Sequence, residues 1–157
     1  MPVILTRIDD RLIHGQVTEG WGKIFKPDLV VVVSDGVASS EWEKELCLAA
    51  LPAHMEGTVV SVDDAPQIIN QLVSDQRPSY ILFESPRDVY MALKKGSQIS
   101  ALNVGGMHSV KEKHEILDYI FVNEEDIKYL KSFRDAGITL DFRDLPDHDN
   151  IDVMSLL

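Results

Sequence analysis

Short runs of apolar, mostly β-branched residues alternate along the chain with segments whose apolar residues recur at helical spacing. Val3–Ile8 is the first apolar run, and the segment 16–25 that follows places Val17 and Trp21 on one helical face. The next run, DLVVVVSD at residues 28–35, lacks the polar alternation of a strand with one solvent-facing side. A strand of this kind is buried on both faces, so the pattern favours a parallel sheet covered by helices on both sides.

The same alternation continues toward the C-terminus. Further strands are predicted at residues 57–62, 80–85, 99–106, 118–123 and 138–146, and further helices at 40–52, 63–75, 85–96 and 124–137. The last strand alternates apolar and polar residues, so we expect it at a sheet edge, where it can run antiparallel. Residues 107–117 are expected to form a loop or a short irregular segment. The prediction is a single α/β domain over residues 1–157, with a doubly wound, mainly parallel β-sheet and helices on both faces.

Charge and cysteine content exclude several classes of function. The chain carries 15 basic and 26 acidic residues, a net charge of -11, which argues against a nucleic-acid partner and against electrostatic adhesion to anionic lipid. Its single cysteine excludes an internal disulfide framework and a multi-cysteine zinc site. With no basic leader and no apolar stretch near the roughly 20 residues that span a membrane, we expect a cytoplasmic protein.

The loop RIDDRLIHGQV, residues 7–17, follows the first strand, where open α/β sheets commonly bind ligands. It places His14 just before a helix, and a neutral imidazole is well suited to carry a phosphoryl group. Arg11 and helical N–H groups are suited to bind phosphoryl oxygens, with Gly15 allowing close approach. No glycine-rich nucleotide loop is present. A solvated connection shaped by arginine–aspartate pairs is the alternative interpretation of this loop.

The motif RIDDRLIHGQV, followed by Trp21, VVVVSD and NVGGM at residues 103–107, resembles the IIB component of the mannose/fructose/sorbose family of the bacterial phosphotransferase system. The resemblance covers essentially the whole chain and is to the free-standing form, because the motif lies at the start of the sequence. It implies a doubly wound domain in which His14 receives a phosphoryl group on Nδ1 from a IIA partner. The group then passes to a sugar bound by the membrane components IIC and IID, with no metal and no cofactor.

The motif and the predicted strand ends define the candidate site. The residues assigned to catalysis are His14 as the phosphohistidine intermediate, Arg11 and Asp10, and those assigned to phosphate binding or support are Gly15, Gln16, Arg7, Asp9, Asp35 and Ser85. Arg7 is expected either to contact phosphate or to form an ion pair at the strand end. Asp9 and Asp10 are divided between orienting His14 and capping backbone N–H groups of the loop. Ser85 has an ordinary N-cap role as its alternative, and Glu84 is expected to turn away from phosphate.

Other notable residues are given structural roles. The remaining histidines show no ligand spacing, so no metal site is expected, although His108 follows NVGGM and is the one placed to reach the site. Cys47 is predicted to be a small core residue on an apolar helical face. Trp21 and Trp42 both occur at the spacing of core residues, and Trp21 is also a candidate for a docking face. The glycines of NVGGM are expected to serve backbone geometry.

The leading hypothesis is a phosphocarrier of sugar uptake. A second is a regulatory IIB-like domain that is phosphorylated on His14 without serving a transporter. A third is an unrelated doubly wound ligand-binding domain in which His14 is structural. The first two share His14 and Arg11, so these residues do not separate them. The third requires the long motif to occur by coincidence.

Overall fold

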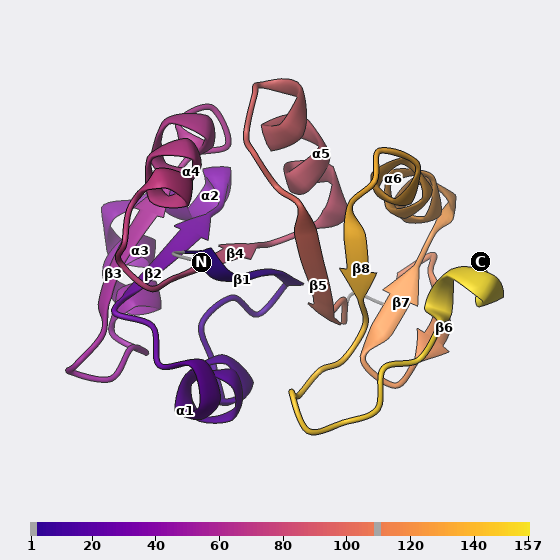
Figure 1. The fold of residues 1–157 in the computed structure, drawn as a ribbon, viewed down its shortest axis with the longest axis horizontal. Helices are drawn as coiled ribbons and strands as arrows, with labels where there is room; N and C mark the ends of the chain where they lie inside the picture. Colours follow the sequence, from indigo (N-terminus) through magenta and orange to yellow (C-terminus); the bar gives the residue numbers. More distant parts are fainter. Residues whose placement is uncertain (1–2, 109–110) are drawn as a thin grey trace.

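The computed structural model describes residues 3–108 and 111–157, and Figure 1 shows its element order. The strands are β1 (Val3–Asp9), β2 (Leu29–Val33), β3 (Glu56–Val60), β4 (Ser79–Phe83), β5 (Ala101–Gly106), β6 (His114–Leu117), β7 (Ile120–Val122) and β8 (Thr139–Asp141). The helices are the π-helical η1 (Gln16–Trp21), α1 (Gly22–Phe25), α2 (Asp35–Ala38), α3 (Glu41–Leu48), α4 (Ala65–Ser74), α5 (Pro86–Lys94), α6 (Glu124–Asp135) and the 3₁₀ turn η2 (Val153–Leu156). Within these ranges, no helix is long and apolar enough to cross a membrane.

Six strands form one parallel sheet in the order β3-β2-β4-β1-β5-β8. The predicted parallel α/β fold is therefore confirmed. The last strand, β8, lies at an edge as expected, but it pairs parallel to β5, so the suggested antiparallel orientation is wrong. Its crossover through α6 has the length that a parallel connection needs.

Helices cover both faces of this sheet because alternate residues of the central strands enter two different cores. Val31, Val33, Ile81 and Phe83 pack with apolar residues of α4, α5 and α6. The intervening residues Val30, Val32, Tyr80 and Leu82 pack instead with Val17 and Trp21 of η1 and with the partly buried Cys47 and Leu48 of α3. Figure 1 shows α4, α5 and α6 on one side of the sheet and α1 on the other. The all-apolar sequence of β2 thus reflects burial on both faces.

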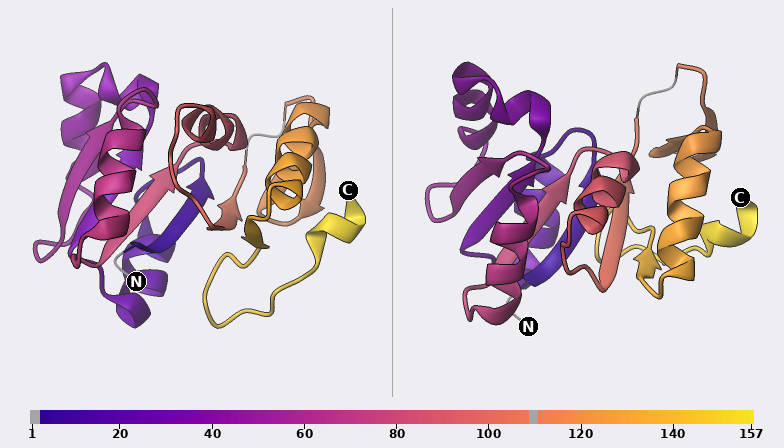
Figure 2. Two further views of the ribbon diagram at one scale, coloured as in Figure 1. Left: turned by 45° about the horizontal axis from the view of Figure 1, so that its top comes forward. Right: turned by 90° about the horizontal axis from the view of Figure 1, so that it is seen from above.

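A small antiparallel sheet of β6 and β7 departs from the sequence prediction. Residues 107–117 were expected to be irregular, yet His114–Leu117 pairs with Ile120–Val122; residues 109–110 lie outside the described part of the chain. The predicted strand at 118–123 exists as β7, but it pairs with β6. A bridge from Ile120 links it to Met107, which follows β5. In Figures 1 and 2 this hairpin and the C-terminal segment lie at the opposite end of the molecule from α3.

Trp42 is the clearest error among the predicted core residues. It lies on α3 as the helical spacing indicates, but 69% of its surface is exposed, as is 60% of Leu46 one turn later. Trp21, in contrast, is buried, and the guanidinium carbons of Arg7 and Arg143 lie 5.9 and 5.5 Å from its ring centroid. Only one of the two tryptophans therefore contributes to a core.

We expect Trp21→Ala to lower the free energy of unfolding by about 3–5 kcal/mol, because it removes a buried aromatic side chain. Trp42→Ala should change it by no more than about 0.5 kcal/mol, since that side chain faces solvent. Urea denaturation followed by circular dichroism measures both values. A similar loss in the two variants would contradict the position of Trp42 in the structure.

Candidate active site at the carboxyl end of β1

The loop bearing His14 lies where the connections that follow two neighbouring strands pass to opposite faces of the sheet. β1 is flanked by β4 and β5. After β1 the chain enters η1, which packs on one core, whereas after β4 it enters α5, which packs on the other. Such a switch point leaves a crevice at the carboxyl ends of the strands, the usual ligand position in open α/β sheets.

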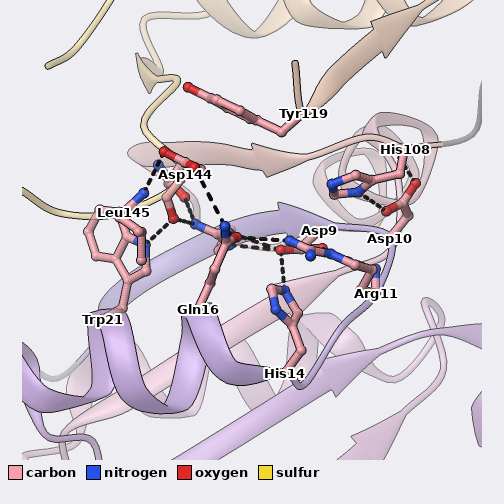
Figure 3. A network of polar contacts seen from close by, with 12 residues as sticks. Asp9, Asp10, Arg11, His14, Gln16, Trp21, His108, Tyr119, Asp144 and Leu145 are labelled. Atoms are coloured by element: carbon pink, nitrogen blue, oxygen red, sulfur yellow. Dashed lines mark hydrogen bonds and ion pairs between the residues drawn. The ribbon is translucent and has the colours of Figure 1, made fainter. Parts of the chain in front are cut away.

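Asp9, the fully buried last residue of β1, is the centre of the polar network drawn in Figure 3. Its Oδ2 accepts from Arg7 Nη2 at 2.9 Å and lies 2.6 Å from His14 Nε2. Its Oδ1 accepts from the backbone N–H of Arg11 at 3.0 Å and lies 3.4 Å from Arg11 Nε. One carboxylate thus connects the strand, the turn and the histidine.

Ionisation of Asp9 is strongly favoured. Burial raises the pKa of its carboxyl, but the hydrogen bond with His14 and the charge of Arg7 outweigh burial and hold the pKa well below its usual range. The folded-state pKa lies below the unfolded value of about 3.9. Asp9 therefore contributes stability that is present above that pH and is lost as the pH falls through the folded-state pKa.

The contact with Asp9 fixes which nitrogen of His14 is available for chemistry. A carboxylate that accepts from Nε2 selects the tautomer with its proton on Nε2 and leaves Nδ1 with a lone pair. Within the described part of the chain, Nδ1 has no hydrogen-bond or ion-pair partner, and 18% of the side chain is exposed. A neutral imidazole presented in this way can act as a nucleophile through Nδ1.

The backbone on both sides of His14 holds it at the start of a helix. Leu12 is buried with φ of 60°, a left-handed conformation that costs non-glycine residues about 1–3 kcal/mol. The carbonyl of His14 accepts from the N–H groups of Val17 and Thr18 at 3.0 and 3.1 Å. At Gly15 an added Cβ would meet nothing within 4 Å, so the space beside the helix start is open.

Arg7 is buried completely and its guanidinium is already bonded on all sides. Besides Asp9, it donates to Asn103 Oδ1 and to the carbonyl of Asp144, both at 2.9 Å, and to Gln16 Oε1 at 3.1 Å. Burial lowers the pKa of this guanidinium and the charge of Asp9 raises it. Of the two expected roles, the structure supports the strand-end ion pair, and the expected direct contact of Arg7 with phosphate is not supported.

Arg11 is an accessible cation of the site, with 41% of its side chain exposed. Its Nη2 donates to Gln16 Oε1 at 2.8 Å, so the same amide oxygen holds both arginines. The amide nitrogen of Gln16 reaches Asp144 Oδ2 at 3.5 Å. Gln16 therefore orients Arg11 next to His14 while leaving part of the guanidinium open to a ligand.

Asp10, assigned to catalysis from the sequence, contacts a different histidine. Its carboxylate accepts from the backbone N–H of His108 at 2.6 Å and lies 2.8 Å from His108 Nδ1. Of the two adjacent aspartates, Asp9 contacts His14, and Asp10 ties the loop to the end of β5. Possible ligand atoms of Asp9, Asp10 and His108 lie within 4.8 Å of one another. Both oxygens of Asp9 are already occupied by Arg7, Arg11 and His14, so we assign no metal to this cluster.

The two glycines of NVGGM make this packing possible through their missing side chains. A Cβ at Gly105 would overlap the guanidinium of Arg7. A Cβ at Gly106 would lie 2.6 Å from His108 Cε1 and 2.8 Å from Asp9 Oδ1. Both glycines have negative φ, which other residues also adopt, so they do not serve the unusual backbone geometry that we expected. They are needed because neighbouring side chains occupy the space that a Cβ would fill.

The remaining predicted residues lie on neighbouring strand ends and bond to backbone. The side chain of Ser85 accepts from Asp88 N at 3.2 Å, which is the N-cap role named as its alternative. Asp35 accepts from Val62 N at 2.8 Å. Neither bonds to the His14 loop among the described residues, so the structure does not support the phosphate contacts expected of them. Glu84 accepts from the Ser34 hydroxyl at 2.8 Å and lines a cavity that Arg11 also lines, so it is not turned away from this rim.

Comparison with known proteins assigns the chain to a protein family. The family described as "PTS system sorbose subfamily IIB component" matches residues 3–157. The chain belongs to this family. The resemblance predicted from RIDDRLIHGQV and NVGGM is therefore confirmed, and the protein is a IIB component of the sugar phosphotransferase system, a class of sugar-transport phosphotransferases.

Individual relatives agree along the whole chain. This IIB component is 34% identical to the fructose-specific EIIB component of Bacillus subtilis, covering 100% of this chain and 96% of the relative. It is 33% identical to the mannose-specific EIIAB component of Escherichia coli, of which it covers 49%. The crystal structure of the IIB domain of the Klebsiella pneumoniae sorbose permease superimposes with a TM-score of 0.89 at 30% identity, covering 99% of this chain and 95% of that one.

Two groups in the network were not among the predicted site residues. Asn103 accepts from Arg7 and donates to the carbonyls of Asp141 and Arg143 at 3.3 and 2.9 Å. The carbonyl of Asp144 accepts from Arg7 and from Trp21 Nε1, the latter at 2.8 Å. Asn103 is the first residue of the NVGGM motif, so the motif could have pointed to it as a site residue. The carbonyl of Asp144 lies 137 positions from Arg7 in the sequence, and no sequence pattern indicates that it accepts from Arg7.

We expect Gly105→Ala to lower the free energy of unfolding by about 1–3 kcal/mol, because the added methyl group must displace the buried Arg7 guanidinium. Gly15→Ala is the matched control, since its methyl group faces open space at the start of a helix. Urea denaturation compares the two. Equal stability of both variants would contradict the close packing of Arg7 against Gly105.

Proposed function

We propose that this IIB component accepts a phosphoryl group on Nδ1 of His14 from a IIA protein and transfers it to a sugar taken up through IIC and IID membrane components. The observation that supports this most directly is the 2.6 Å contact between Asp9 and His14 Nε2. It leaves Nδ1 as the nucleophilic atom and supplies a buried anion that stabilises positive charge on the ring.

The first transfer is an in-line displacement at phosphorus. Nδ1 of His14 attacks the phosphoryl group of a donor phosphohistidine, so one N–P bond forms as the donor's N–P bond breaks and the donor imidazole recovers its electron pair. Phosphoryl transfer of this kind has a loose transition state, and catalysis depends on positioning and charge compensation. Arg11, held by Gln16, is the residue we assign to the phosphoryl oxygens, with N–H groups of the first helical turn beside it.

The second transfer regenerates His14. A sugar hydroxyl attacks phosphorus, its oxygen forms the new P–O bond, and its proton leaves to water. The N–P bond breaks and its electron pair returns to Nδ1, while the proton on Nε2 stays in its bond to Asp9. The ring therefore leaves as a neutral imidazole, a better leaving group than an anionic one.

The partners are proposed from the family. The E. coli relative is named as an EIIAB component, which supports a IIA-type donor for this chain. Transfer to an incoming sugar requires the chain to act at the cytoplasmic face of the membrane, next to IIC and IID. A regulatory role without a dedicated transporter uses the same first transfer, and it predicts phosphorylation without sugar-dependent loss of the phosphoryl group.

Incubation with the general phosphotransferase proteins and a cognate IIA should place one acid-labile phosphoryl group on wild-type protein. We expect ¹⁵N NMR of histidine-labelled protein to place it on Nδ1 of His14, because Nε2 is engaged by Asp9. His14→Ala should reduce labelling to background, and His54→Gln, which changes an exposed histidine, should leave it unchanged. Labelling of His14→Ala would contradict the carrier role, and phosphorylation on Nε2 would contradict the orienting role of Asp9.

The two adjacent aspartates should differ in their effect on this reaction. Asp9→Asn removes the anion that orients His14, and we expect the initial rate of phosphorylation to fall at least about 100-fold. Asp10→Asn should reduce it less than about 10-fold, because Asp10 contacts His108. A larger loss with Asp10→Asn would contradict this assignment.

Asp9→Asn also leaves Arg7 buried without its anion, at a cost of about 3–5 kcal/mol, so circular dichroism must show that the variant is folded. If it is not, ¹⁵N shifts of wild-type protein test the same contact. They should show that the singly protonated ring of His14 carries its proton on Nε2, and a singly protonated ring with its proton on Nδ1 would contradict the assignment.

A further inference from the structure

Helix α3 presents two large apolar side chains to solvent. Trp42 and Leu46 are 69% and 60% exposed, and their i, i+4 spacing places them next to each other on one face. Contiguous exposed apolar surface with polar residues around it marks interaction sites in soluble proteins. We call the face formed by Trp42, Glu43, Leu46 and Ala50 the α3 patch.

The α3 patch is continuous with the candidate active site. Glu43, Leu46 and Ala50 line an open cavity of about 420 Å³. The same cavity is also lined by Arg11, Leu12 and Ile13 of the histidine loop. A partner that reaches the phosphoryl group on His14 from this side therefore meets the α3 patch in the same approach.

The charge around the patch is negative. The α3 helix carries Glu41, Glu43 and Glu45 against the single cation Lys44. Glu84 adds a further carboxylate in the cavity wall. An apolar centre with an acidic rim fits a partner segment that combines an apolar side chain with lysine or arginine.

We propose that the α3 patch docks a basic cytoplasmic segment of the membrane component that presents the sugar. Short cytoplasmic loops of membrane proteins are enriched in lysine and arginine. A chain with a net charge of -11 is repelled by anionic lipid, so its approach to the membrane needs a specific basic contact. This inference rests on the proposed function and adds the surface through which the second transfer is reached.

The test separates the two transfers. Phosphorylation of the IIB component by IIA is measured with purified proteins, and sugar phosphorylation is measured by adding phosphorylated IIB component to membranes that contain IIC and IID. For the double variant Trp42→Ala/Leu46→Ala, we expect the KM for phosphorylated IIB component in the second reaction to rise about 10-fold or more with kcat unchanged. The rate of the first reaction should stay within about 2-fold.

Matched changes test the apolar and the charged parts separately. Val73→Ala/Met91→Ala removes two exposed apolar side chains from α4 and α5 and should leave both reactions unchanged. Glu43→Lys should raise the same KM at low ionic strength, and the effect should shrink at high salt because exposed charges are screened.

Each outcome decides the proposal. A selective rise in KM for the second reaction supports docking of the membrane component. Loss confined to the first reaction would assign the patch to IIA and overturn the proposal, and unchanged kinetics in both would show that the patch docks neither. Failure of wild-type protein to accept a phosphoryl group from IIA would instead contradict the proposed function.

Discussion

The buried ion pair of Arg7 and Asp9 is the interaction on which the site depends. A buried charge is tolerated only when it is paired and its remaining hydrogen-bonding positions are filled. Here the filling groups come from distant parts of the chain: Asn103 on β5 and the carbonyl of Asp144 beyond β8. The absence of a side chain at Gly105 gives the guanidinium its space. Forming the pair therefore requires β1, β5 and the C-terminal segment to be in place together.

The same carboxylate passes this rigidity to His14. Asp9 has no exposed surface, yet it binds His14, which does, so a fixed buried residue sets the orientation of a partly exposed one. Its second oxygen holds the backbone of Arg11 in the turn. Gln16 then joins the two arginines from the helix side. Residues of the turn that would otherwise move independently are held in one arrangement by a single buried anion.

A feature of the fold or the site could be predicted from the sequence when the residues that determine it are neighbours in the sequence. The apolar run of β2 and the position of the His14 loop follow from local pattern, and both were predicted. The choice between Asp9 and Asp10 did not follow, because successive residues at a strand end point to opposite sides. Asp9 meets His14 from its own loop, whereas Asp10 meets His108, which is distant in sequence. Helical spacing placed Trp42 on a common face with Leu46, but spacing does not reveal whether another element covers that face. The four-residue strand β6 lies in a charged segment without alternation, so it carried no strand signal.

The distribution of positive charge at the site bears on how a transferred phosphoryl group would be held. Of the two arginines near His14, Arg7 is fully occupied by protein acceptors, and Arg11 shares its guanidinium with Gln16. Among the residues that the structure describes, a phosphoryl group on Nδ1 would therefore meet one accessible cation, Arg11, while Asp9 and Asp10 keep the surrounding field from becoming strongly positive. A carrier must release what it accepts, and stabilisation of the phosphorylated state alone would raise the barrier to the second transfer. Burying one arginine in an ion pair and leaving the other exposed gives the loop a fixed shape without making it a tight phosphate-binding site.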